Sequence, residues 1–142
     1  MNRIDRLYME MIHFYQDDPK HIQHFVKVHS FSRLIGQAEG LDEKQLYTLE
    51  AAALVHDIGI KIGMEKYGRS DGKTQEQEGP EAAREMLTRL GFQENVIRRV
   101  EYLVGHHHTY KNIEGLDYQI LVEADFLVNY FEDGLDQEHI RQ

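Results

Sequence analysis

Two adjacent residues, His56 and Asp57, offer the clearest chemistry in the sequence. They follow an apolar segment and precede Gly59, a residue type common at helix ends. Adjacent side chains on a helix point about 100° apart, so the two converge on one ion only near a helix end. An imidazole nitrogen and a carboxylate oxygen suit Fe, Mn, Co, Ni or Zn. The pair therefore indicates a metal site, and a capped helix end without metal is the plain alternative.

Two more polar residues fall on apolar helical faces. His29 lies on the inward stripe of one predicted helix, and Asp125 lies within a segment that is apolar almost all round. A lone buried carboxylate is costly and is normally paired, protonated or metal-bound. A hydrogen-bonded core histidine and a buried salt bridge are the ordinary alternatives. Their joint occurrence favours an open metal site between three helices, with ligands His29, His56, Asp57 and Asp125.

The elements that must position these residues are all predicted to be helices, because apolar residues recur with helical spacing and no segment alternates like a strand. The predicted helices span residues 2–15, 19–38, from Asp42 to the His56-Asp57 pair, 75–90, 94–107 and 117–131. The fourth has an awkward Gly79-Pro80, which favours a start near Pro80. The last is predicted to be central and buried. Residues 58–74 are expected to form a mobile basic loop, and 134–142 a polar, fraying tail.

Composition bounds the class of protein. The chain has 142 residues, enough for one domain. Its formal charge of −9 argues against duplex nucleic acid and anionic membrane as partners. It has no cysteine, which excludes disulfides and thiolate metal sites. No signal peptide and no run of about 18 apolar residues is present, so we expect a soluble, cytoplasmic protein.

The ordered set His29, His56-Asp57 and Asp125 resembles the H…HD…D signature of the HD-domain superfamily of metal-dependent phosphohydrolases. The resemblance covers roughly residues 20–130, with 27 residues from His29 to His56 and 68 from Asp57 to Asp125. It implies an all-α, HD-domain-like bundle of about six helices around a buried metal site. Residues 1–142 would form a single domain, with the first helix packed on its core. It also implies that those four residues are the metal ligands.

The resemblance extends to a second ion. Members with two metals usually add a histidine before the fourth helix and one or two more at the end of the fifth. Gln75 stands where the first would fall, and His106 and His107 stand where the others would. Glu76 or Glu78 can substitute, since carboxylates serve hard ions well. We expect one tight ion and a second that is weak or absent, with ligands His106, His107 and Glu76.

Under this resemblance Asp57 would also orient the attacking water, which the metal activates. Lys61 and Arg33 are predicted phosphate contacts, although solvated surface cations are the alternative. His106 and His107 would otherwise act as a general acid or contact phosphate. The remaining polar groups are expected to line the entrance (His108, Thr109, Tyr110) or to serve as surface or packing residues (His13, His21, His24, His139).

The leading hypothesis is a metal-dependent phosphohydrolase acting on a nucleotide or another small phosphate ester. Two alternatives remain open: a diiron oxygenase on the same scaffold, and a non-catalytic nucleotide-binding module. The expected partner is a small phosphorylated substrate, with no duplex nucleic acid and no membrane. The sequence makes no prediction of the substrate's base or sugar, or of oligomeric state.

Overall fold

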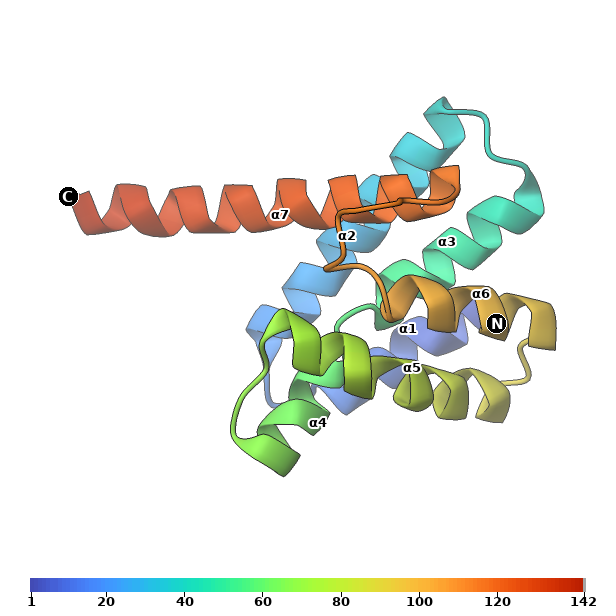
Figure 1. Cartoon of the computed structure of the whole chain (residues 1–142), viewed down its shortest axis with the longest axis horizontal. Coiled ribbons are helices and arrows are strands. Elements are labelled where there is room, and N and C mark those ends of the chain that lie inside the picture. Colours follow the sequence, from blue (N-terminus) through green and yellow to red (C-terminus); the bar gives the residue numbers. More distant parts are fainter. Residues whose placement is uncertain (142) are drawn as a thin grey trace.

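The computed structural model describes the backbone of residues 1–141 and the side chains of residues 1–134. Within these residues it has helices and no strand, which confirms the all-α fold (Figure 1). Seven helices replace the six predicted, because the segment predicted as a mobile loop contains one more. They are α1 (Arg3–Phe14), α2 (Pro19–Ala38), α3 (Glu43–Val55), α4 (Ile58–Tyr67), α5 (Gly72–Arg89), α6 (Glu94–Val104) and α7 (Leu116–Arg141).

Side-chain caps set where the helices begin. Asn2 accepts a hydrogen bond at the start of α1, and Asp18 does so at the start of α2, just before Pro19. Asp42 and Gln45 form a reciprocal capping box on α3. Asp71 caps α5 through the amide of Thr74. The start of α5 is therefore fixed by this cap at Gly72, and the predicted start near Pro80 is wrong because Pro80 lies inside the helix.

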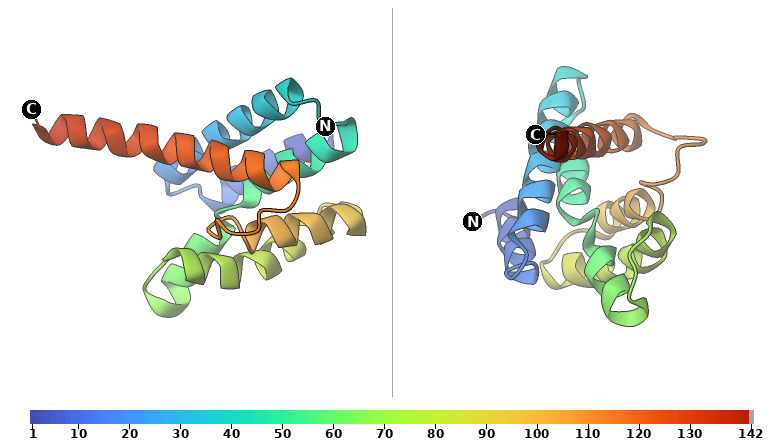
Figure 2. Two further views of the ribbon diagram at one scale, coloured as in Figure 1. Left: turned by 45° about the horizontal axis from the view of Figure 1, so that its top comes forward. Right: turned by 90° about the vertical axis from the view of Figure 1, so that its left-hand side faces the viewer.

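The central helix is α3. It packs against α1, α2, α6 and α7, and Ala51 to Val55 are completely buried. Its run of alanines allows neighbours to approach from every side. The prediction that the last helix is central is wrong for its second half, because Phe126, Tyr130 and Phe131 are exposed. In Figures 1 and 2, α7 extends past the body of the bundle.

The segment after His56-Asp57 is ordered rather than loop-like. Most of residues 58–74 form α4, which packs closely on α5. A Cβ at Gly59 would lie 2.8 Å from the carbonyl oxygen of Gln75 and 3.0 Å from the amide nitrogen of Gly79. Only a glycine permits this approach, which brings α5 beside the His-Asp turn.

Two helices also end at residues other than those predicted. The fifth predicted helix, α6, ends at Val104, so the three histidines lie in the turn that follows it. The helix α7 continues to Arg141, through most of the segment predicted as a polar tail. Residue 142 and the side chain of His139 lie outside the described residues. Among the helices described, none combines the length and the apolar character needed to cross a bilayer.

Candidate metal centre

His56 and Asp57 occupy the junction between two helices. His56 is the C-terminal cap residue of α3, and Asp57 occupies the N-cap position of α4 without making a side-chain capping bond. The carboxylate is therefore free for another purpose, and the capped-end alternative does not apply. The hydroxyl of the buried Tyr15 donates to the Asp57 carbonyl oxygen at 2.7 Å and fixes the turn. This change of direction lets two adjacent side chains face the same point.

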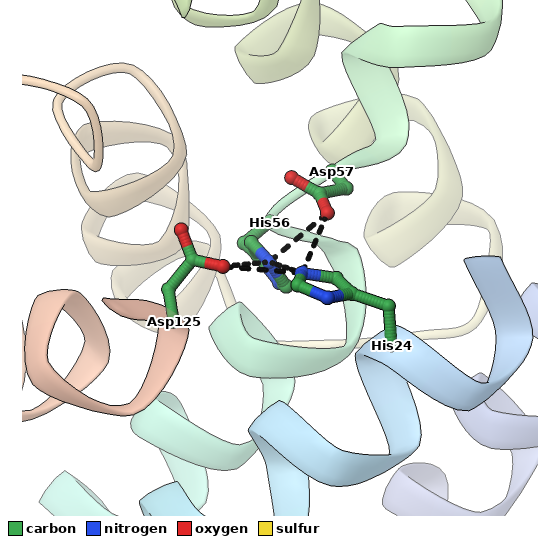
Figure 3. A group of neighbouring side chains, drawn as sticks. All are labelled: His24, His56, Asp57 and Asp125. Atoms are coloured by element: carbon green, nitrogen blue, oxygen red, sulfur yellow. Dashed lines mark hydrogen bonds and ion pairs between the residues drawn. The ribbon is translucent and has the colours of Figure 1, made fainter. Parts of the chain in front are cut away.

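Four buried side chains converge there: His24 from α2, His56 and Asp57 from the junction, and Asp125 from α7 (Figure 3). One ligand atom from each lies within 4.8 Å of all the others. His24 Nε2 is 3.0 Å from Asp57 Oδ2 and 3.1 Å from Asp125 Oδ1. His56 Nε2 is 3.2 Å and 3.3 Å from the same two oxygens. Two imidazoles and two carboxylates thus share one point between three segments of the chain.

The histidine from α2 is His24, and His29, which the sequence favoured, is elsewhere. The Nε2 of His29 contacts Glu50 Oε1 at 3.0 Å, and its Nδ1 contacts the hydroxyl of Tyr8 at 2.8 Å. Because the carboxylate only accepts, Nε2 donates to it and Nδ1 accepts from the phenol. This is the ordinary hydrogen-bonded core histidine that was the alternative for His29. The interpretation of His24 as a surface or packing residue is wrong.

The turn between α2 and α3 explains why His24, and not His29, lies in the cluster. These helices form a hairpin whose connection contains Gly40 in the left-handed conformation. His24 lies sixteen residues before Gly40 and His56 sixteen residues after it, so the two meet across the hairpin. His29 lies eleven residues before Gly40 and meets Glu50, ten residues after it. His29 is on a buried face but about 7 Å too far along the helix axis.

The outer nitrogen of each imidazole of the cluster faces an acceptor. His56 Nδ1 lies 2.6 Å from the Ala53 carbonyl oxygen, which can only accept, so Nδ1 carries a proton. His24 Nδ1 lies 3.4 Å from Glu132 Oε2, also an acceptor. The two Nε2 atoms therefore point inward, 3.3 Å from each other and close to two carboxylates. Lone pairs in this arrangement repel unless a cation lies between them, and the donor set fits a divalent metal ion.

Without metal, protons supply that cation. Burial disfavours the imidazolium, but hydrogen bonds to Asp125 and Asp57 outweigh it and raise the pKa of His24 to about 9. His56 is completely buried, yet the same two carboxylates hold its pKa well above the ordinary value. Burial would raise the carboxylate pKa values, but the charge on His56 and hydrogen bonds lower the pKa of both Asp57 and Asp125. A metal ion must displace these protons to bind.

A second group of side chains shares Asp57. The structure brings Asp57, His107 and His108 together with ligand atoms within 4.8 Å. His107 Nδ1 donates to the Val104 carbonyl oxygen at 2.8 Å, which turns Nε2 inward. This buried Nε2 has no hydrogen-bond partner and lies 3.6 Å from Asp57 Oδ1. A buried nitrogen without a hydrogen-bond partner is suited to bind a metal ion or a substrate oxygen.

Two residues predicted for the second ion have other contacts. His106 Nδ1 contacts the Tyr102 carbonyl oxygen, and its ring stacks on Tyr102. Glu76 accepts from the amide of His108 and the hydroxyl of Thr109, so it holds the histidine turn in place. Of the predicted pair, only His107 faces Asp57, because the ring of His106 is held against Tyr102.

Gln75 lies beside the second group. Its Oε1 contacts His108 Nε2 at 2.6 Å, and its amide nitrogen donates to the Ser70 carbonyl oxygen. Burial and the neighbouring His107 lower the pKa of His108, which keeps this ring neutral. The ring nitrogen that would bind a metal is therefore engaged by an amide. His108 was expected at the entrance, and helical spacing does not indicate that it would replace His106 in this group.

The two predicted phosphate contacts also have other partners. Lys61 Nζ donates to the Phe14 carbonyl oxygen at the end of α1. Arg33 is largely exposed and lies 4.0 Å from Glu50, in the hollow that contains His29. The prediction for Arg33 depended on His29 being a ligand, because residues four apart share a helical face. The structure therefore brings neither cation to the cluster.

Comparison with known proteins agrees with this geometry. The family model of the HD domain matches residues 22–140, which is most of the chain. The chain therefore belongs to the HD domain family, whose superfamily consists of metal-dependent hydrolases. Searches of curated proteins and of solved structures found no significant match. The family and the His/Asp cluster agree on a site that can hold a metal ion.

Proposed function

We propose that this chain is a metal-dependent phosphohydrolase acting on a nucleotide or another small phosphate ester. One observation carries the proposal: His24, His56, Asp57 and Asp125 direct four ligand atoms at one point. The Nδ1 atoms of both histidines face acceptors, which leaves both Nε2 atoms directed inward. Two histidines and two carboxylates leave positions open for water and substrate on most divalent metals. Mn, Fe, Co, Ni or Zn would suit this mixed nitrogen and oxygen set.

The residues around the site have separate roles in this proposal. A divalent ion in such a site lowers the pKa of water and neutralises charge on a phosphate. His24 and His56 hold their inward nitrogens in place through Glu132 and the Ala53 carbonyl. Asp57 is common to both groups, so its two oxygens face different histidines. It is placed to orient a water between them, and Tyr15 fixes its backbone.

We assign His107 to the reacting side of the site. Its unpartnered Nε2 is 3.6 Å from Asp57 Oδ1, within reach of a substrate oxygen or a second ion. A second ion would use Asp57, His107 and His108, and His108 would first have to break its contact with Gln75. This requirement supports one tight ion and a second that binds more weakly.

The test is phosphate release from a panel of nucleotides and phosphate esters. The protein would be stripped of metal and reloaded with Mn, Fe, Co, Ni or Zn, and Asp57→Asn would be compared with the unmodified chain. His107→Gln and His106→Gln form a matched pair of neighbouring histidines. We expect release that requires metal and Asp57, falls with His107→Gln, and is unchanged by His106→Gln.

Other outcomes would replace the proposal. Oxygen uptake by the iron form without phosphate release would establish the oxygenase. Nucleotide binding without turnover under any metal would establish a binding module. Equal loss of activity in both histidine variants would contradict the role given to His107.

A further inference from the structure

Residues 126–131 of α7 present a large aromatic surface to solvent. Its buried positions lie in the first part of the helix, from Tyr118 to Val128. The side chains of Phe126, Tyr130 and Phe131 are 65%, 74% and 58% exposed. Beyond these residues, α7 continues past the body of the bundle in Figure 1. An isolated helix gains little stability in water, so such a segment normally packs against something.

A groove lies beside this surface. The hollow has a volume of about 690 Å³ and runs between α2 and α7, which pack on each other. Its lining is almost wholly apolar and includes Phe31 from α2 and Leu127, Tyr130, Phe131 and Gly134 from α7. Among the lining residues described, Lys27 carries the charge; it lies over the Phe131 ring and pairs with Glu132 at 3.6 Å. The described part of the groove therefore fits an apolar helix face.

The exposed area is that of an interface. Three aromatic side chains line the groove, and Phe126 and Leu34 are exposed neighbours of Tyr130 and Phe31 at helical spacing. With Leu127, these six residues expose roughly 700 Å². The largest apolar patch of a typical monomer is about 300–600 Å², and a stable interface buries about 800 Å² per partner. A surface of this size is close to what each partner of a stable dimer contributes.

The charge of α7 distinguishes two candidate partners for this surface, an anionic membrane and a second copy of the chain. Residues 116–134 of α7 contain no lysine or arginine and five acidic residues, and the whole chain carries −9. Helices that lie on anionic membranes have basic polar faces, so a membrane is disfavoured. The α7 helix of a second copy of the chain is favoured as the partner. The same surface carries both an exposed aromatic face and an apolar groove beside it, so the face of one copy can enter the groove of the other. A two-fold pair requires such a self-complementary patch.

We propose that two copies of this chain pair through this surface, each α7 lying in the α2/α7 groove of the other. A Cβ at Gly134 would meet no atom within 4 Å, so this position is open to a crossing helix. The pairing does not depend on the catalytic proposal. It would steady α7, which also carries Asp125 of the metal centre.

Sedimentation velocity on the full chain tests the pairing from about 1 to 200 µM. We expect a concentration-dependent dimer. Phe131→Glu on α7 and Phe31→Glu on α2 alter opposite walls of the groove at exposed positions, so the fold should persist. Each substitution occurs twice in a symmetric pair and should raise the dimer dissociation constant at least about 100-fold.

Met64→Glu is the matched control, because Met64 is an exposed apolar residue on α4, away from the groove. It should leave the dissociation constant unchanged. Helical circular dichroism and cobalt binding would confirm that each variant is folded. The proposal is overturned by a monomer at every concentration, by a dimer that both groove variants leave intact, or by binding of the monomer to anionic phosphatidylserine vesicles through this surface.

Discussion

His24→Gln should remove tight metal binding, whereas His29→Gln should not. Both residues are buried histidines on α2, five positions apart, and each contacts a carboxylate. His24 Nε2 faces Asp57 and Asp125 at the metal centre, whereas both nitrogens of His29 are already used by Tyr8 and Glu50. The pair therefore separates coordination from burial.

The magnitudes follow from these contacts. Losing a residue that merely orients a metal ligand costs 10–100-fold in affinity, so losing His24 itself should cost at least about 100-fold. Replacing His29 removes two hydrogen bonds of a buried network, so we expect a loss of about 1–3 kcal/mol of stability and an unchanged metal affinity. In the metal-free protein His24→Gln should also destabilise, since it leaves Asp57 and Asp125 without one of their cations.

Isothermal titration of Co²⁺ into metal-free protein measures the affinities, and thermal unfolding measures the stabilities. Both variants should lower the Tm of the metal-free protein, but they should differ in metal affinity: weak Co²⁺ binding for His24→Gln and normal binding for His29→Gln. The reasoning would be refuted by His29→Gln losing metal while His24→Gln retained it.

Three further predictions follow. Glu132→Gln should weaken Co²⁺ binding about 10–100-fold in the same titration, because Glu132 faces His24 Nδ1; unchanged affinity would contradict this orienting role. The pKa of His24 is about 9 in the folded protein, against an ordinary value of 6.5. The protonated ring therefore contributes about 3 kcal/mol to the stability of the metal-free protein. This contribution is complete below pH 6.5 and is lost as the pH rises through 9. The increase in Tm caused by metal should therefore be larger at pH 9 than at pH 6, and the opposite order would count against it. Gly59→Ala should lower the free energy of unfolding by about 1–3 kcal/mol in urea denaturation, because its Cβ meets the backbone of α5; a stability equal to that of the unmodified chain would count against this packing.

Helical periodicity was enough to predict the all-helical fold and the buried placement of Asp125. It also put His29 on a buried face, which is correct. It could not choose between His24 and His29, because periodicity gives the face of a residue but not its level along the axis. The position of Gly40 held that information: counting equally in both directions from the turn pairs His24 with His56.

The second half of the site depended on tertiary contacts. Which histidine of the run at 106–108 faces Asp57 is set by the turn after Val104, whose geometry periodicity does not determine. The folding of 58–67 into α4 depends on the glycine contact with α5. The apolar residues of α7 predicted burial, but Phe126, Tyr130 and Phe131 are exposed.

A crystal of the chain soaked in Co²⁺, with anomalous scattering recorded at the cobalt edge, tests the central claim most directly. We predict a strong peak about 2.0–2.2 Å from His24 Nε2 and His56 Nε2 and within bonding distance of Asp57 and Asp125. A peak at His29 and Glu50, or no peak at the four-residue cluster in crystals that bind cobalt elsewhere, would contradict it.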